Sequence, residues 1–298
     1  MRTLHLDAGR EMRGGQWQVL RLLEGLAAAG VEVSLLARVG SPLFAAARKR
    51  GWNVGPLGMA RVFWEARRHD LVHAHDARSH TLAALAGGAP LVVARRVAFP
   101  LGSPKMFSRW KYARAGCYIA VSEFVRSVLL AGGVSPETIE VVYDGVPLLE
   151  PASGSTVLAP ANAGDPQKGA ALAAEAARLA GLTLRFGDQL ERDLREAGLF
   201  LYLTRSEGLG SAALLAMSAG VPVVASNVGG LREVIRHREN GLLVENTVEA
   251  VAAALRELTA DRELARRLGR AARQTVQERF TIDIMVRKTV GIYHKVLS

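Results

Sequence analysis

Short apolar runs alternate with longer segments of helical periodicity along this chain of 298 residues, and the series occurs twice. In the first half the apolar runs occupy residues 3–8, 31–37, 71–75, 90–95, 117–122 and 139–145. In the second half they occupy residues 156–160, 182–187, 199–204, 221–226 and 241–245. Strands that alternate with helical segments in this way predict βαβ units around parallel sheets. The sequence therefore predicts an α/β protein with two domains of similar construction.

The boundary between these domains is expected within residues 145–155, GVPLLEPASGS, because this stretch has the proline, glycine and serine content of a linker. We expect the first domain over residues 1–145 and the second over 146–280. Residues 281–298 form a final helix in this interpretation. Ligands of parallel α/β sheets bind beyond the carboxyl ends of the strands, so the loops after strands are the first places to look for chemistry.

Basic residues are concentrated in the first domain. Residues 1–145 carry 19 Lys and Arg against 11 Asp and Glu, whereas residues 146–298 carry 19 against 17. This excess suits an anionic partner, namely nucleic acid, a membrane surface or a phosphate-bearing substrate, and it also suits solubility alone.

Cys117 is the single cysteine, so the chain has no internal disulfide and no cysteine-based metal site. The sequence shows no signal-like start and no run of 18 apolar residues, so we expect a cytoplasmic protein.

Three loops that follow strands have residues suited to binding an anion. Gly14 and Gly15 precede a predicted helix over residues 16–29, where backbone N–H groups and the helix dipole attract negative charge. Lys168 follows the first strand of the second domain and is a flexible point charge suited to phosphate. A plain glycine turn and an ordinary surface lysine remain open at these places. The third loop, SEGLGS over residues 206–211, lies between a strand and a helix.

Two nucleotide-binding motifs are not supported by these loops. The chain has no G-x-x-x-x-G-K-[ST] loop. The letters Gly208-x-Gly210-x-x-Ala213 satisfy a relaxed dinucleotide fingerprint, but Asn227 stands where that fingerprint needs an acid to hold a ribose. A nicotinamide-dependent oxidoreductase is therefore not favoured.

Residues 206–245, SEGLGSAALLAMSAGVPVVASNVGGLREVIRHRENGLLVE, resemble the donor-binding segment of the retaining glycosyltransferases of family 4. GGQWQVLRLLEGLAAAGVEVSLLAR, DLVHAH, IAVSEFVRSVL and IEVVYDGV match that family's order of elements in the first domain, so the resemblance covers nearly the whole chain. It implies the GT-B fold, with two Rossmann-like domains facing each other across a cleft. It also implies that residues 281–298 cross back to the first domain.

The resemblance implies a site as well. A nucleotide-diphosphate sugar would be the donor, the second domain would bind it, and the first domain would hold the acceptor. No cofactor and no metal would be needed, because basic groups and backbone amides neutralise the leaving diphosphate. Glu207 and Lys168 would be catalytic, and the donor would lie against Gly14, Gly15, Gly208, Leu209, Gly210 and Ser211.

This sequence departs from the family pattern at three places in the second domain. Leu215 replaces the glutamate that usually binds the ribose, and leucine cannot accept a hydroxyl proton. Ala163 stands where an arginine usually completes the basic pair with Lys168. The segment between residues 188 and 199 is shorter than usual. These departures bear on how the nucleotide is recognised.

The first domain has its own candidates for binding the acceptor or a phosphate. Arg95 and Arg96 stand where many members carry a histidine, and they would either supply the missing charge, grip a phosphate or form a salt-bridged loop. His75 and Asp76 follow a strand and would meet the acceptor or serve the structure. Residues 95–116 interleave basic and aromatic side chains, which suits an anionic membrane surface, RNA or packing within the domain.

The sequence as a whole favours a retaining hexosyltransferase that uses a nucleotide-sugar and acts on a glycan or lipid-linked acceptor of cell-envelope biosynthesis. Peripheral attachment to the inner face of the membrane through residues 95–116 is a further expectation, and nucleic acid is not favoured as a partner. The alternatives are a catalytically impaired GT-B protein that binds a nucleotide-sugar and, less favoured, a nucleotide-sugar epimerase.

Overall fold

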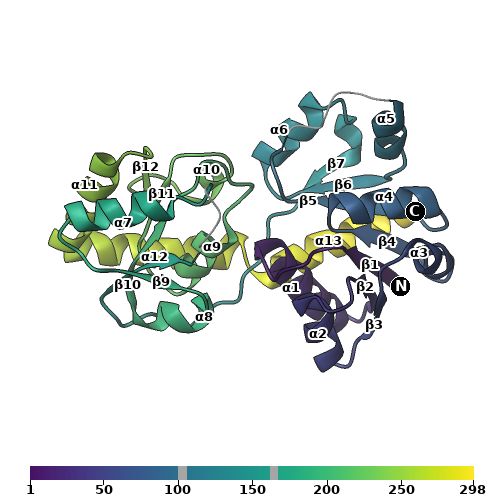
Figure 1. Ribbon diagram of the computed structural model, residues 1–298, viewed down its shortest axis with the longest axis horizontal. Helices are drawn as coiled ribbons and strands as arrows, with labels where there is room; N and C mark the ends of the chain where they lie inside the picture. Colours follow the sequence, from purple (N-terminus) through teal and green to yellow (C-terminus); the bar gives the residue numbers. More distant parts are fainter. Residues whose placement is uncertain (100–105, 162–166) are drawn as a thin grey trace. The chain divides into compact units, whose positions relative to one another are not determined.

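The computed structural model describes residues 1–99, 106–161 and 167–298, and these form two compact units. Unit 1 consists of Met1–Gly145 together with Ile282–Ser298, and unit 2 consists of Val146–Thr281. Each unit is a parallel β-sheet with helices on its faces (Figure 1). Ala163, which stands where the family pattern has an arginine, lies outside the described residues.

Unit 1 contains a seven-stranded parallel sheet of order β3-β2-β1-β4-β5-β6-β7. Its strands are β1 (Arg2–Asp7), β2 (Glu32–Ala37), β3 (Asn53–Pro56), β4 (Leu71–Ala74), β5 (Leu91–Arg95), β6 (Cys117–Ala120) and β7 (Ile139–Val141). Its helices are α1 (Gly14–Ala28), α2 (Pro42–Lys49), α3 (Met59–Ala66), α4 (Ala77–Ala86), α5 (Met106–Ala113), α6 (Glu123–Ala131), the 3-10 turn η1 (Pro136–Thr138) and α13 (Ile282–Leu297).

Unit 2 contains a five-stranded parallel sheet of order β12-β11-β10-β8-β9. Its strands are β8 (Thr156–Pro160), β9 (Leu184–Gly187), β10 (Ala197–Tyr202), β11 (Val223–Ser226) and β12 (Leu242–Val244). Its helices are α7 (Ala170–Leu179), α8 (Leu190–Asp193), the 3-10 turn η2 (Leu194–Glu196), α9 (Ser211–Ser218), α10 (Leu231–Val234), α11 (Val248–Ala260) and α12 (Arg262–Arg279). The two sheets confirm the predicted class, an α/β chain with two parallel-sheet domains.

The strand pattern explains which side chains of unit 1 face which helices. Successive residues of a strand point to opposite faces of the sheet. Cys117 and Ile119 of β6 belong to the core cluster formed with α1 and α13, whereas the Tyr118 ring packs against His80 of α4. Helices α1 and α13 therefore cover one face of the sheet, and α4 covers the other. Figure 1 shows α13, drawn in yellow, alongside α1.

Two elements differ from the sequence prediction. Helix α1 begins at Gly14 rather than at Gln16, so the paired glycines form its first turn instead of a loop before it. Strand β3, Asn53–Pro56, was not predicted. It is an edge strand of four residues, and its Gly55 and Pro56 are residue types that strands usually exclude.

Among residues 1–99, 106–161 and 167–298, no helix combines the length and the apolar character that crossing a bilayer requires.

The contact between α1 and α13 depends on a glycine. A Cβ atom on Gly25 would overlap Cγ2 of Val286. Gly291, in the middle of α13, has open space around it. We expect Gly25→Ala to lower the free energy of unfolding by about 1–3 kcal/mol, because overpacking costs more than the gain in helix propensity. Gly291→Ala should instead raise it by up to about 1 kcal/mol, because alanine favours helix.

Urea unfolding of both variants and of the wild type measures these changes. Equal effects of the two substitutions would contradict close packing of α13 against α1.

Candidate functional site

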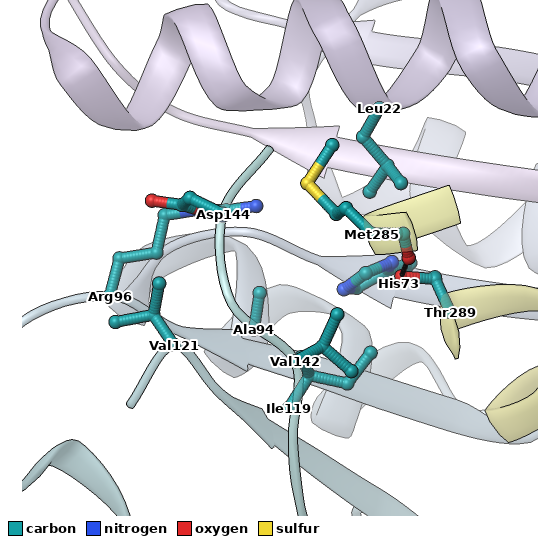
Figure 2. A pocket seen from close by; sticks show the side chains of 10 residues that line it. All are labelled: Leu22, His73, Ala94, Arg96, Ile119, Val121, Val142, Asp144, Met285 and Thr289. Atoms are coloured by element: carbon teal, nitrogen blue, oxygen red, sulfur yellow. Dashed lines mark hydrogen bonds and ion pairs between the residues drawn. The ribbon is translucent and has the colours of Figure 1, made fainter. Parts of the chain in front are cut away.

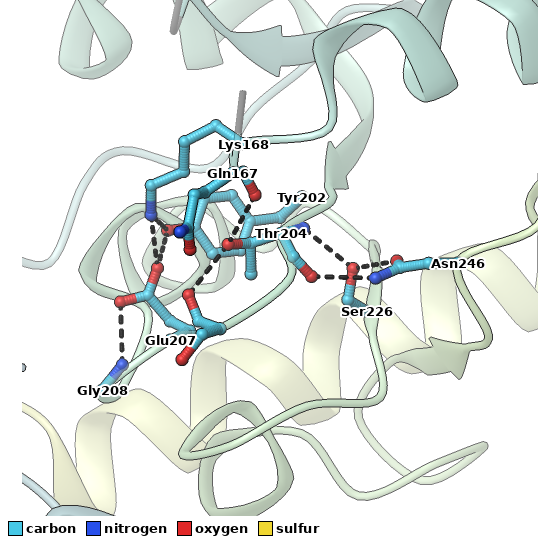
Figure 3. A network of polar contacts seen from close by, with 9 residues as sticks. Gln167, Lys168, Tyr202, Thr204, Glu207, Gly208, Ser226 and Asn246 are labelled. Atoms are coloured by element: carbon cyan, nitrogen blue, oxygen red, sulfur yellow. Dashed lines mark hydrogen bonds and ion pairs between the residues drawn. The ribbon is translucent and has the colours of Figure 1, made fainter. Parts of the chain in front are cut away.

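A glutamate, a lysine and a tyrosine meet beyond the carboxyl end of β10 in unit 2 (Figure 3). The Lys168 Nζ atom lies 2.8 Å from Oε2 of Glu207, and the Tyr202 hydroxyl donates to the same oxygen at 2.5 Å. Lys168 Nζ also donates to the Tyr202 oxygen at 3.4 Å. The other carboxylate oxygen, Oε1, accepts from the backbone N–H of Gly208 at 3.1 Å. The sequence prediction named Glu207 and Lys168, and the fold brings them into contact.

The pair remains accessible from solvent although it is held tightly. The Lys168 side chain is 25% exposed and that of Glu207 is 17% exposed. Tyr202 is buried, and burial together with the negative charge of Glu207 raises the pKa of its phenol well above the usual range. Tyr202 is therefore a neutral donor at any physiological pH, and it holds one oxygen of Glu207 from the protein interior. A ligand can still approach the charged ends of Lys168 and Glu207.

A closed set of hydrogen bonds holds the strand ends around this site (Figure 3). The backbone N–H of Thr204 donates to Oγ of Ser226 at 2.9 Å, and that hydroxyl donates to Oδ1 of Asn246 at 2.5 Å. Asn246 Nδ2 in turn donates to the carbonyl of Thr204 at 3.0 Å. Each polar group in this set has a hydrogen-bond partner, and such a network holds the ends of the strands in fixed positions.

Glycines bring the loop after β10 into direct contact with the loop after β11. The N–H of Gly230 donates to the carbonyl of Glu207 at 3.1 Å, and a Cβ atom on Gly230 would overlap the Gly208 carbonyl. Gly210 has φ of +106° at the start of α9, a conformation that disfavours other residues. Leu209 is buried between these glycines. Leu215, on α9, is also buried and packs in the interior.

Unit 1 contains three buried histidines that form one cluster. His5 of β1 lies beside His73 of β4 in the register of the sheet, and His75 follows two residues later on the same face. His5 Nδ1 and His75 Nε2 are 3.0 Å apart, and His5 Nε2 is 3.1 Å from the hydroxyl of Thr3. The sequence prediction named His75 but missed its two partners. The alternating letters His73-Ala-His75, read together with His5 on the neighbouring strand, were the available signal.

Arg96 determines which ring nitrogens of this cluster carry protons. Its Nη1 lies 3.3 Å from His75 Nδ1, and a guanidinium only donates. His75 Nδ1 must therefore accept, and His75 Nε2–H donates to His5 Nδ1. His5 Nε2–H then donates to the Thr3 hydroxyl, which donates to the carbonyl of Glu32 at 3.2 Å. The result is a chain of hydrogen bonds that runs in one direction from Arg96 into the sheet.

The histidines of this cluster are neutral. Burial lowers the pKa of His5 to about 3, with nearby basic groups such as Arg96 adding to the effect. The pKa values of His73 and His75 are also well below the usual range, again mainly because of burial. The three rings place one nitrogen each within 4.8 Å of one another, as a metal site would. However, two of these nitrogens already bond each other, and a cationic Arg96 lies against His75. The geometry therefore supports a hydrogen-bonded relay rather than a metal site.

Arg96 is itself held in place at the end of β5. Its Nε lies 3.3 Å from Oδ1 of Asp144, and the two side chains are only 14% and 8% exposed. Arg96, Asp144 and His73 line a cavity of about 20 Å³, which suffices for one water molecule (Figure 2). His73 Nδ1 bonds the Tyr293 hydroxyl of α13 at 2.6 Å, and among the described residues its Nε2 has no partner.

The remaining predicted residues of unit 1 do not form one group. Arg95 points to the opposite face of the sheet from Arg96, because consecutive residues of a strand alternate. The Asp76 carboxylate caps α4 and accepts from four donors, two of them on Ser79. Gly14 opens α1 without a side-chain cap, and the space above its Cα is empty.

Comparison with known proteins finds a glycosyltransferase family model for each of the two units. The family model described as Glycosyltransferase Family 4 matches residues 12–149, and the model described as Glycosyl transferases group 1 matches residues 167–275. These matches span most of both units and include Glu207 and Lys168.

Curated relatives match about a third of this chain. The chain is 37% identical over 111 residues to the N-acetyl-alpha-D-glucosaminyl L-malate synthase of Bacillus anthracis, which is 37% of this chain and 29% of that protein. It is 42% identical over 83 residues to a GDP-mannose-dependent alpha-(1-6)-phosphatidylinositol monomannoside mannosyltransferase of Mycobacterium tuberculosis, covering 28% of this chain and 22% of that protein. The matches thus span less than a third of these relatives.

Solved structures match over almost the whole chain. Anabaena Alr3699/HepE in complex with UDP and glucose gives a TM-score of 0.85 at 18% identity, covering 99% of this chain and 100% of that one. The sucrose-phosphate synthase of Thermosynechococcus elongatus gives 0.78 at 19% identity, covering 99% of each chain. The chain therefore has the GT-B fold, as the sequence predicted.

The neutral histidines make the stability of unit 1 depend on pH. Below pH about 6.5 the unfolded chain takes up protons on His5, His73, His75 and His80, whereas the folded unit does not until pH falls toward about 3 for His5 and His80. The unfolded state then binds more protons, so stability falls as pH falls. We expect a loss of about 1.4 kcal/mol per pH unit for each such histidine.

Urea unfolding of unit 1 at pH 7, 6 and 5 measures this slope. His80→Gln should reduce it by roughly the share of one histidine, whereas His294→Gln, an exposed control on α13, should leave it unchanged. Identical slopes for the two variants would contradict a neutral His80.

Proposed function

We propose that this chain, which belongs to the family 4 glycosyltransferases of group 1, transfers a hexose from a nucleotide-diphosphate sugar to a glycan or lipid-linked acceptor of the cell envelope. The transfer retains the anomeric configuration in this proposal. The observation that carries it is the contact of Glu207 with Lys168 and Tyr202 at the end of β10, inside the segment that the group 1 model matches.

The donor class is supported by what the relatives bind. The Anabaena structure holds UDP and glucose, and the mycobacterial relative depends on GDP-mannose. Both ligands have a diphosphate that needs positive charge. In unit 2 the cation at the site is Lys168, whose flexible stem lets its ammonium exchange the Glu207 carboxylate for a phosphate oxygen.

The proposed division of labour follows from the contacts. Once Lys168 turns to the diphosphate, Oε2 of Glu207 becomes available to accept a hydroxyl hydrogen of the donor sugar. Tyr202 keeps the carboxylate in position by donating to it. We also assign the backbone amides of Gly208, Leu209, Gly210 and Ser211 to the donor, because the start of α9 has no side-chain cap and adds positive potential there. We assign neutralisation of the leaving diphosphate to these groups, without a metal ion or a cofactor.

Unit 1 supplies groups suited to contact the diphosphate and an anionic membrane surface. The uncapped start of α1 at Gly14 and Gly15 offers backbone N–H groups to a diphosphate. Arg96, held by Asp144 and His75, is a positioned cation at the end of β5 and stands as the substitute for the missing arginine at Ala163. Residues 95–116 are proposed to contact an anionic membrane surface. Of these, 100–105 lie outside the described residues, while the Trp110 side chain is 40% exposed.

One observation favours a second candidate function. Leu215 is buried on α9 and offers no acceptor to a ribose. A protein of this family that binds a nucleotide-sugar without turning it over would have the same architecture.

Substitution of Glu207 tests the main proposal. Glu207→Gln keeps the size of the side chain but removes its charge, so turnover should fall by about 10²- to 10³-fold. Glu249→Gln, the same change at an exposed position on α11, should leave turnover unaltered. Release of nucleoside diphosphate from UDP- and GDP-sugars measures the rate.

Thermal shift with the same donors separates the two candidate functions. Stabilisation of the wild type by a donor without any release of nucleoside diphosphate would favour the binding protein. Equal turnover of Glu207→Gln and the wild type would refute the role given to Glu207.

A further inference from the structure

The middle of unit 1 has no acidic residue over a long stretch. Residues 77–122 contain neither Asp nor Glu across 46 positions. The same stretch carries seven basic residues: Arg78, Arg95, Arg96, Lys105, Arg109, Lys111 and Arg114. It includes α4, β5, α5 and β6, so the excess charge belongs to the folded unit rather than to a tail. Neutralisation must come from elsewhere in the chain or from a ligand.

Arg95 and Arg96 are adjacent in the sequence, and Arg96 has a carboxylate partner. Arg96 pairs with Asp144 and donates to His75 on the α1 and α13 face. Arg95 points to the other face, where its Nη2 donates to the carbonyl of Phe99 at 2.6 Å. Its Nε is buried, and within the described part of the chain it meets no acceptor. Arg95 is thus a half-buried guanidinium without a carboxylate among the described residues.

Lys111 of α5 brings a second cation to the same face. Its Nζ donates to the carbonyl of Ala77 at the start of α4, at 3.0 Å. The Lys111 ammonium therefore lies at the α4 face of the sheet, toward which Arg95 also points. Burial lowers the pKa of Lys111, and the positive charge of Arg95 lowers it further. The nearby Asp76 carboxylate is occupied by its four donors at the cap of α4. No ion pair of Lys111 exists among the described residues.

The position of Lys111 is fixed by the structure around it. The carbonyl of Lys111 accepts from His80 Nε2 at 3.2 Å, and the neighbouring carbonyl of Tyr112 accepts from the Tyr118 hydroxyl at 2.8 Å. His80 is neutral because burial lowers its pKa to about 3. Two buried side chains therefore hold the end of α5 and keep Lys111 on the same face of the sheet as Arg95. A fold that holds two unpaired cations together is suited to bind an anion between them.

We propose that Arg95 and Lys111 bind a phosphate group of the acceptor. This inference rests on the proposed glycosyl transfer, in which unit 1 holds the acceptor. A guanidinium offers two parallel donors and an ammonium a compact charge, a combination suited to phosphate. The phosphate belongs either to a water-soluble acceptor or to the headgroup of a lipid, and the chemistry of the site is the same for both.

Titration with inorganic phosphate, followed by ³¹P NMR, tests the site directly. Arg95→Gln and Lys111→Gln should each weaken binding at least tenfold relative to the wild type. Arg114→Gln removes an equal charge from an exposed position just beyond α5 and should have little effect. Lys111→Arg keeps the charge and should restore binding, which distinguishes loss of the site from loss of the fold.

Sedimentation with vesicles separates the two sources of phosphate. If Arg95→Gln and Lys111→Gln bind phosphatidylglycerol vesicles less than Arg114→Gln does, the acceptor phosphate belongs to a lipid. If only binding of inorganic phosphate is weakened, the acceptor is soluble. Either result supports the site. Wild-type protein that binds neither probe, or variants that match Arg114→Gln in both assays, would overturn it.

Thermal stabilisation by UDP-sugars and GDP-sugars keeps this test independent of the proposed function. None of the substituted residues is assigned to the donor, so all four variants should respond to a donor as the wild type does. A wild type that binds phosphate through Arg95 and Lys111 but responds to no donor would contradict the glycosyltransferase proposal and leave the phosphate site standing.

Discussion

Parallel pairing of the strands is the constraint on which both candidate sites depend. When every strand of a sheet runs in the same direction, all carboxyl ends meet at one edge, and the loops that leave this edge lie close together. In unit 2 this brings Glu207, after β10, to Lys168, after β8. In unit 1 it brings His75, after β4, to Arg96, after β5. Residues far apart in the sequence thus reach hydrogen-bonding distance without any special local motif.

The two sites handle buried polar groups differently. In unit 2 a charged pair stays partly exposed, and a neutral tyrosine donates to it from the interior. In unit 1 the three clustered histidines are neutral rings, because charged imidazoles would lose too much hydration energy in the interior. Beside the three histidines, Arg96 and Asp144 form an ion pair at the end of β5. The first arrangement is suited to exchange partners when a ligand arrives, and the second is suited to hold one cation in a fixed orientation.

The sequence predicted the fold class because apolar strand runs and helical periodicity occur in strict alternation, and the parallel sheets confirm it. Glu207 and Lys168 could be named because their loops resemble a known segment, and their roles stay predictions. Tyr202 could not be found in this way, since a tyrosine in the strand LFLYLT has the pattern of a core residue. Arg95 and Arg96 point to opposite faces of the sheet, and this could be seen only once the register of β5 was known. His5 and His73 needed the pairing of β1 with β4.

Helix α13 belongs to unit 1 although it follows all of unit 2 in the chain, and the hydrogen bond between His73 and Tyr293 joins residues 220 positions apart. During synthesis unit 2 therefore emerges, and is able to fold, before the sheet of unit 1 receives the helix that covers Leu22, Leu26 and Ile119. Until then that apolar face is exposed to the cell. The nascent chain therefore carries an apolar surface that the finished protein conceals.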